Sequence, residues 1–377
     1  ARAHLLYHAP FMIVLCVVAF AVALFAAGFI VRWGRGHAAH YGASMPQRFH
    51  FGHVPRLGGV AVLLGVAASW ILGAAQSLWG DPGSLRLGGW VGWWLLALLP
   101  AVLGGIAEDL VQRLSVLYRL VLTACSGVLA VAVVGITLPR LGLPWLDAVL
   151  DFAPWLGLAI AVLAIAGLPH AFNLIDGYTG LAGMVALIVC LALAHVAMQV
   201  GDRALAALLV SLAAATAGFL VWNYPRGLLF AGDGGAYLWG VVIAIASLSL
   251  VQRNQDVSPW FPMLLLIYPV WETVFSIYRK AARGVSPGVA DALHFHQLIY
   301  RRIVRSVFHD DESRRLLMRN NRTSPYLWGF TLLTVAPAVM FWNNTPVLML
   351  CCAVFVVSYV AAYLAIVRFK VPGWLRR

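Results

Sequence analysis

Apolar runs long enough to cross a membrane recur along almost the whole chain. A helix needs about 20 mostly apolar residues to span the hydrocarbon core, and of the 377 residues 62% are hydrophobic while only 11% are charged. Soluble domains are about 25% charged, so the composition excludes an ordinary soluble enzyme. It predicts an all-α polytopic membrane bundle with about eleven transmembrane helices, near residues 10–32, 55–77, 88–107, 117–137, 151–170, 179–200, 204–222, 235–253, 260–279, 325–343 and 346–367.

Lys and Arg predict how such a bundle is oriented, because loops on the cytoplasmic side carry an excess of both. With the N-terminus outside and the C-terminus in the cytoplasm, the outer segments hold only Arg2, Arg86, Arg140, Arg203 and Arg253 of the 26 basic residues. The opposite orientation would place most of the positive charge outside. The sequence therefore predicts that the N-terminus is outside and the C-terminus is cytoplasmic.

The net charge of +12 follows from the same excess. Binding to nucleic acid would need basic residues clustered on a soluble face, and we expect no soluble domain and no nucleic-acid partner. Residues 1–377 are interpreted as one integral membrane domain with a single sizeable cytoplasmic loop at 280–325. The basic stretches of that loop suit either the anionic inner leaflet or simple solvation. The five cysteines lie in apolar runs and indicate neither a disulfide framework nor a metal site.

Four polar clusters fall at the predicted cytoplasmic ends of the spans or in the cytoplasmic loop. They are Glu108–Asp109, the stretch 170–176, Asp233 between glycines, and the pair His294 and His296. Their common side predicts one site. Neighbouring residues on a helix point about 100° apart, so one acid of the first cluster is expected to face the site while the other pairs with Arg113 or Arg119.

Each cluster has a structural interpretation beside the functional one. The first could be solvated at a helix end, the second an interhelical turn, the third an N-cap, and the fourth a surface pair. The functional interpretation is phosphoryl transfer, because Mg²⁺ takes few protein carboxylates together with substrate phosphates and arginines favour phosphate recognition. Glu272 inside an apolar run is expected to be buried and paired, and His195 to be satisfied between helices.

Five motifs, in this order, resemble those of the polyprenyl-phosphate N-acetylhexosamine-1-phosphate transferases, the family that includes UDP-GlcNAc:undecaprenyl-phosphate enzymes. The motifs are PQRFHFGHVPRLGGV at 46–60, GGIAEDL at 104–110, HAFNLIDGYTGLAG at 170–183, GDGGAYLWG at 232–240 and SPGVADALHFHQLIYRR at 286–302. The resemblance implies a catalytic domain at the bacterial inner membrane that moves a sugar-1-phosphate from a UDP-N-acetylhexosamine to undecaprenyl phosphate and releases UMP.

The resemblance also implies roles for residues at the acidic motifs. Asp233 stands at the position of the family's Mg²⁺ ligand, and Asn173 is implied as a second ligand. Mn²⁺ is the expected substitute cation. Glu108 and Asp109 occupy the place of the usual Asp-Asp pair, which is associated with the lipid phosphate or its deprotonation. Asp176 matches the acid of the uridine-side motif.

The remaining implied residues bind substrate. His294 and His296, with Arg301 and Arg302, match the histidine motif that helps to hold the diphosphate. We expect Arg113, Arg119, His170 and Asn173 at the same site. A homodimer in the lipid bilayer is a further expectation.

Three departures from the family pattern bear on the substrate. Glu108 is one methylene longer than the usual Asp, His170 stands where the family often has Asn, and Thr179 stands where many GlcNAc-using members have a second Asp. We prefer a GlcNAc or deoxy-N-acetylhexosamine donor that serves O-antigen or capsule assembly. The alternatives are a phospho-MurNAc-pentapeptide transferase, whose histidine motif is usually richer, and a secondary transporter, which would place polar groups near the bilayer midplane.

Overall fold

The computed structural model describes residues 2–34, 54–76, 87–284, 293–304 and 311–368, and every regular element in them is a helix. The N-terminal elements are α1 (Arg2–Trp33), α3 (Gly58–Gln76), α4 (Val91–Val111), α5 (Val116–Leu129), a π-helical turn (Ala130–Val134), α6 (Pro144–Phe152), α7 (Pro154–Ile175) and α8 (Leu181–Gln199). They are followed by α9 (Arg203–Asn223), α10 (Gly232–Arg253), α11 (Trp260–Leu265), α12 (Ile267–Ala281), α13 (Phe295–Arg302), α14 (Glu312–Met340) and α15 (Thr345–Val367).

Nine of the described helices are long and apolar enough to cross a membrane. The chain is a polytopic helical membrane protein, as its apolar runs predict. The expected number of eleven is not confirmed. The span predicted at 260–279 is divided at Leu266 into α11 and α12. The span predicted at 325–343 overlaps the C-terminal half of the longer and more polar α14, which ends at Met340.

The segment predicted as a cytoplasmic loop at 280–325 contains helical structure. Within the described residues it contains all of α13 and the first half of α14, which begins at Glu312. Arg and Asn side chains lower hydropathy without breaking a helix, so hydropathy alone placed the start of α14 too late. Residues 285–292 and 305–310 of that segment, and residues 46–53 of the first motif, lie outside the described part of the chain.

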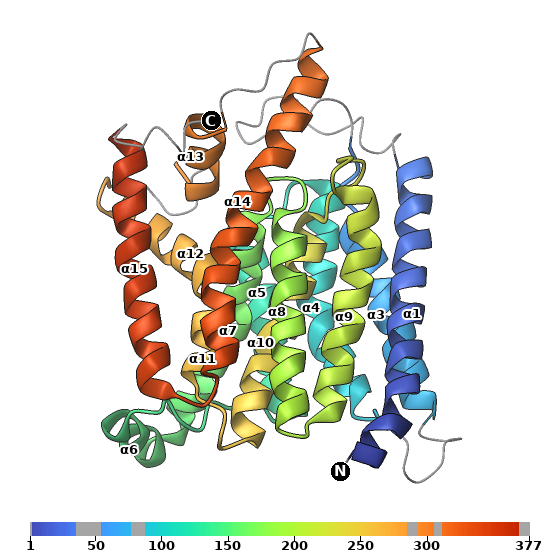
Figure 1. Ribbon diagram of the computed structural model, residues 1–377. Coiled ribbons are helices and arrows are strands. Elements are labelled where there is room, and N and C mark those ends of the chain that lie inside the picture. Colours follow the sequence, from blue (N-terminus) through green and yellow to red (C-terminus); the bar gives the residue numbers. More distant parts are fainter. Residues whose placement is uncertain (1, 35–53, 77–86, 285–292, 305–310, 369–377) are drawn as a thin grey trace.

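Helix α10 lies in the interior of the bundle, and every residue of its most apolar 18-residue stretch is buried. A helix that is apolar on all sides needs neighbours on all sides, and α10 packs against α3, α4, α7 and α8. Figure 1 shows α1 and α3 on one flank of the bundle and α15 on the other. The shorter α11 and α13 pack against α14 and α15.

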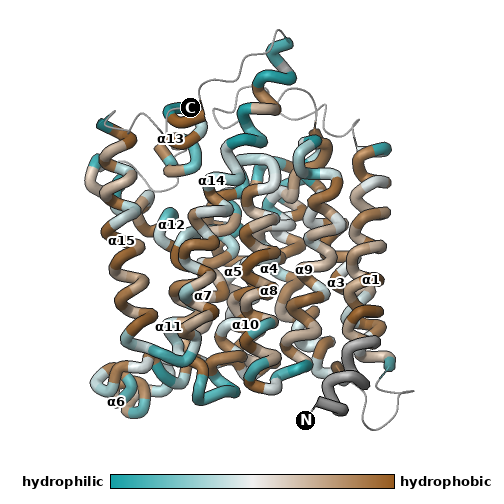
Figure 2. The backbone as a smooth tube through the Cα atoms, in the orientation of Figure 1, coloured by the Kyte–Doolittle hydropathy of each residue, from teal (hydrophilic) through white to brown (hydrophobic). Residues whose placement is uncertain are grey.

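The two ends of the bundle are polar and its middle is apolar, as Figure 2 shows. Helices α4 and α7 end, and α10 begins, at the upper end of the bundle in Figure 1, and the first turns of α14 project above them. Helix α13 lies at this same end. The fold therefore gathers all four polar clusters at one end, which we call the site end.

Candidate functional site

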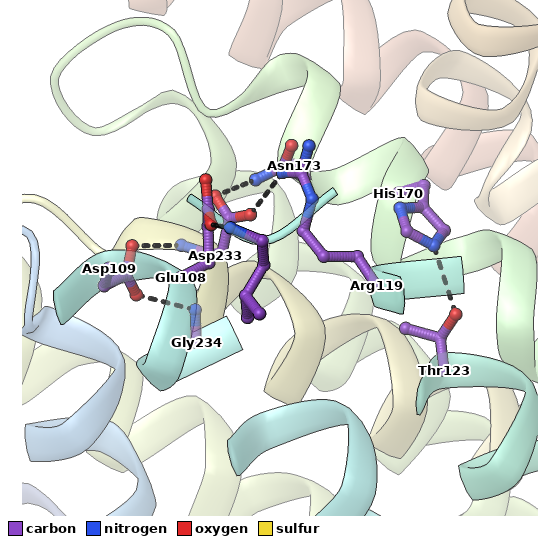
Figure 3. A network of polar contacts seen from close by, with 9 residues as sticks. Glu108, Asp109, Arg119, Thr123, His170, Asn173, Asp233 and Gly234 are labelled. Atoms are coloured by element: carbon purple, nitrogen blue, oxygen red, sulfur yellow. Dashed lines mark hydrogen bonds and ion pairs between the residues drawn. The ribbon is translucent and has the colours of Figure 1, made fainter. Parts of the chain in front are cut away.

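Asp233 is the centre of the polar network at the site end. It lies in the first turn of α10, and its carboxylate accepts a hydrogen bond from Asn173 Nδ2 at 2.7 Å and forms an ion pair with Arg119 at 2.8 Å. The three side chains come from α10, α7 and α5 (Figure 3). The Asp233 and Arg119 side chains are 18% and 22% exposed, so the group is sheltered from water but reachable.

Asp109 holds the beginning of α10 in place. Its two carboxylate oxygens accept the backbone N–H groups of Asp233 and Gly234, each at 2.9 Å, and the residue is only 4% exposed. The first amides of a helix lack partners within the helix and attract negative charge. Asp109 therefore caps α10 from the end of α4, and it places Asp233 in the site (Figure 3).

The side chain of Glu108 points in another direction from that of Asp109, as the helical spacing predicts. Its Oε2 accepts the backbone N–H of Leu114 at 2.7 Å, in the turn between α4 and α5. Arg119 forms its ion pair with Asp233, and its positive charge also acts on Glu108. Arg113 is exposed on the turn after α4.

The stretch around His170 is helical, which corrects the expected interruption there. Helix α7 continues through Ile175, so His170 and Asn173 are three residues apart and share a face. His170 Nε2 lies 3.1 Å from Thr123 Oγ1, and its ring contacts Tyr237 edge-on at 5.2 Å. Thr123 and Tyr237 are site neighbours that the sequence did not reveal, because each reads as an ordinary residue of an apolar helix.

Asp176 follows the last residue of α7 and is half-buried. Burial, together with the negative charge of Asp233, raises the pKa of Asp176 to about 7. The opposing positive charge comes from Arg56, which also acts on Asp109.

Arg56 was missed as a site residue, although it lies in the first motif. The segment before α3 runs along the start of α10: Phe230 N–H donates to the Pro55 carbonyl at 2.9 Å, and Gly58 N–H donates to the Phe230 carbonyl at 2.8 Å. These bonds place Arg56 beside the acids. The available signal is a basic residue of the first motif directly before a helix.

The histidine pair forms a second buried group. His294 precedes α13 and His296 is in its first turn, with their rings stacked at 5.4 Å and 4°. Burial lowers the pKa of His296 to about 3, so its ring is neutral near pH 7. The His296 ring contacts Tyr178 at 5.5 Å, and a Cβ built on Gly177 would lie 3.4 Å from its Nε2.

The turn at 176–178 therefore joins the two groups: Asp176 lies on the acidic side and Tyr178 against the histidines. The structure thus brings these clusters together at the site end. The two arginines after the pair differ. Arg301 is exposed, whereas Arg302 donates to the carbonyls of Ile366 and Val367 at the end of α15, a structural contact that the sequence did not indicate.

Within the described ranges, no three His, Cys, Asp or Glu side chains are grouped so as to hold a metal ion. Asp233 and Asn173 nevertheless bring a carboxylate and an amide together from two helices. Both supply the oxygen ligands that Mg²⁺ takes, and this cation needs only one or two of them from protein. The donor set thus fits Mg²⁺ once the Asn173 amide presents its oxygen.

Comparison with known proteins agrees with this arrangement. The sequence profile of glycosyl transferase family 4 matches residues 91–251, which contain Asp109, Asn173, Asp176 and Asp233. Over these residues the chain is similar to this family. The matched residues contain the acidic group, while the histidine pair lies beyond them.

Three relatives show how far the likeness extends. A probable undecaprenyl-phosphate N-acetylglucosaminyl 1-phosphate transferase of Bacillus subtilis is 27% identical over 66% of each chain. A decaprenyl-phosphate N-acetylglucosaminephosphotransferase of Mycolicibacterium smegmatis is 26% identical over 90% of this chain and 86% of its own. A phospho-N-acetylmuramoyl-pentapeptide-transferase of Moorella thermoacetica is 30% identical over 54% of this chain and 63% of its own.

Proposed function

We propose that this protein transfers a sugar-1-phosphate of the N-acetylhexosamine type from a UDP-sugar to undecaprenyl phosphate. The observation that carries the proposal is the meeting of the Asp233 group with the histidine pair across the turn at 176–178, at one end of a bundle of membrane-length helices. Such a site faces a lipid phosphate from the membrane and a nucleotide from water. The names of the relatives support the same reaction class.

The reaction is one displacement. A phosphate oxygen of the lipid attacks the β-phosphorus of the UDP-sugar, the bond to the bridging oxygen breaks, and UMP leaves with the electron pair. The second pKa of a phosphate monoester is about 6, so the nucleophile is mostly deprotonated at pH 7. Catalysis then depends on positioning and on neutralising charge, which Arg119 and Arg56 are placed to do.

Asp233 and Asn173 would hold a Mg²⁺ ion, with Mn²⁺ as a substitute. The bound cation would neutralise phosphate charge and fix the two phosphates relative to each other. Arg119 pairs with one carboxylate oxygen of Asp233 in the structure. We therefore expect the Arg119 side chain to turn toward phosphate when the cation binds. Asp109 leaves no free oxygen for that purpose, because both accept backbone N–H groups.

We further propose that the site end faces the cytoplasm of the bacterial inner membrane and that the product initiates O-antigen, capsule or a related glycan. The relative from Moorella thermoacetica makes phospho-MurNAc-pentapeptide a second candidate donor group. A secondary transporter is disfavoured, since the polar groups lie at one end of the helices and not at their middle.

Release of UMP by purified protein in detergent tests the proposal. Undecaprenyl phosphate would be offered with a panel of UDP-N-acetylhexosamines and UDP-MurNAc-pentapeptide, each with Mg²⁺, Mn²⁺ or EDTA. We expect UMP from one donor, dependent on both lipid and cation, and loss of turnover in Asp233→Asn without loss of the thermal transition. Folded protein that releases no UMP from any donor would contradict the proposal, and full turnover in EDTA would contradict the cation.

A further inference from the structure

A buried carboxylate lies behind the histidine pair, outside the acidic group. Glu272 is in α12 and has 0% exposure. Its Oε1 accepts the backbone N–H of Phe295 at 3.0 Å and lies 3.3 Å from His294 Nδ1. Its Oε2 accepts the hydroxyl of Tyr359, from α15, at 2.6 Å.

Burying the Glu272 carboxylate costs free energy of folding, which suggests that the residue has a role. A buried charge must be paired and hydrogen-bonded to be tolerated, and an apolar residue at the meeting point of three helices would avoid the cost. These three partners of Glu272 either belong to the start of α13 or support it from α15. The carboxylate therefore acts on the segment that carries the histidines.

The position of the histidine rings follows from this contact. Glu272 fixes the backbone at Phe295 and the ring of His294, and His296 stacks on His294 within 4° of parallel. The opposite end of α13 is held separately, because Arg319 of α14 donates to the carbonyls of Tyr300 and Val304, each at 2.7 Å. Helix α13 has only eight residues, so these two anchors set its place beside the turn at 176–178.

We propose that Glu272 is a positioning residue for recognition of the donor diphosphate. It touches no reacting atom; it holds His294, and through the stack His296, at the edge of the site where the nucleoside diphosphate binds. This inference rests on the proposed function for the identity of the ligand. It adds a residue from α12, which the sequence indicates only as a buried acid.

A double-mutant cycle tests whether Glu272 acts through His294. The variants are Glu272→Gln, His294→Ala and the two combined, with Glu312→Gln as a matched control because Glu312 is exposed at the start of α14. The readouts are kcat and KM for the UDP-sugar, KM for undecaprenyl phosphate, and the Kd of UDP by calorimetry without lipid. Loss of an orienting partner commonly costs on the order of 10–100-fold.

We expect Glu272→Gln to lower kcat/KM for the UDP-sugar and to weaken UDP binding on that scale, with the KM of the lipid unchanged. The combined variant should be no worse than His294→Ala alone, since residues acting as one unit are not additive. The proposal would be overturned if the effects of the two single variants multiply in the combined variant. It would also be overturned if Glu272→Gln has the kcat/KM and the UDP affinity of the wild type. Inactive wild-type protein would instead reject the proposed function, so the two failures are distinguishable.

Tyr359→Phe keeps the proposal testable if Glu272→Gln does not fold. This change removes one donor to Oε2 and leaves both contacts with α13 in place. We expect a smaller rise in the KM of the UDP-sugar, again absent when His294 is already Ala. An effect that persists at full size in the His294→Ala background would show that α15 acts on the fold alone and would overturn the proposal.

Discussion

Asp109 gives both of its carboxylate oxygens to the backbone at the start of α10. In Asp109→Asn one oxygen is replaced by an amide that cannot accept, so one buried N–H loses its partner. Such a loss costs about 1–3 kcal/mol, and we expect a lower thermal transition together with reduced turnover. Asp233→Asn should reduce turnover without lowering the transition.

Thermal unfolding in detergent, run beside the UMP assay, separates these two acids. A variant Asp109→Asn with an unchanged transition and no turnover would return this residue to a chemical role, as the resemblance implies. The structure favours the structural role, because the carboxylate is 4% exposed and directed at amides.

Asp176 predicts a pH dependence of stability. Its pKa is raised to about 7 by burial and by Asp233, against about 3.9 in an unfolded chain. A raised pKa means that the folded state favours the protonated acid, so this contribution is complete below about pH 4 and is lost as the pH rises through 7. Asp176→Asn removes the titration.

The measurement is the difference in thermal transition between the wild type and Asp176→Asn, taken in EDTA from pH 4.5 to pH 8. We expect the thermal transition of Asp176→Asn to rise relative to that of the wild type as the pH rises. A difference that stays constant over this range would show that Asp176 is ionised throughout in the folded protein.

Single residues were predictable where their chemistry conflicts with an apolar setting. Glu272 was expected to be buried and paired, and it is. The expectation that His195 is satisfied between helices is wrong, because His195 is exposed and its Nε2 lies 2.9 Å from Gln199 of its own helix. The anchoring contact of Arg302 and the place of Arg56 were not predictable, because both depend on partners distant in sequence.

At the scale of helices, close approach between α4 and α10 places Asp109 against its amides. A Cβ at Gly105 would lie 2.6 Å from the backbone nitrogen of Gly234, whereas a Cβ at Gly92, in the same helix, would meet nothing within 4 Å. We expect Gly105→Ala to force the helices apart, at a cost of about 1–3 kcal/mol, and to reduce turnover. Gly92→Ala should be neutral or gain up to about 1 kcal/mol.

Thermal transitions and UMP release of this matched pair check the prediction. Equal behaviour of the two variants would show that α4 and α10 have room to adjust, and that Asp109 does not depend on their spacing.

The positions of most helices were predictable from hydropathy, for example 204–222 against Arg203–Asn223. The errors have physical causes. Helix α7 runs on to Ile175 because a polar face turned toward other helices leaves its backbone bonds intact. The break at Leu266 precedes Pro269, which has no N–H to donate to the carbonyl of Leu265. Hydropathy registers neither effect.

On the scale of the whole molecule, one arrangement explains both the charge asymmetry and the site. Among the described residues, the end opposite the site carries Arg140, Arg203 and Arg253, and Arg140 donates to four carbonyls that close the segment after α10. Most of the other described arginines lie at the site end. Convergence of the polar clusters was predictable, because the orientation of the helices alone decides on which side each loop lies. The different roles of Asp109 and Asp233 were not predictable, because they depend on the packing of α4 against α10.

Orientation in the membrane is the prediction that this arrangement makes for the molecule as a whole. The excess of positive charge predicts that the site end lies in the cytoplasm. Arg226, before α10, and Gln255, after it, should then lie on opposite sides of the membrane. Both residues are exposed. In a background without the five native cysteines, an impermeant maleimide applied to intact spheroplasts should label Gln255→Cys and spare Arg226→Cys. Permeabilisation should then expose Arg226→Cys. The reverse pattern would put the site outside, where a UDP-sugar made in the cytoplasm could not reach it, and would contradict the proposed reaction together with the orientation.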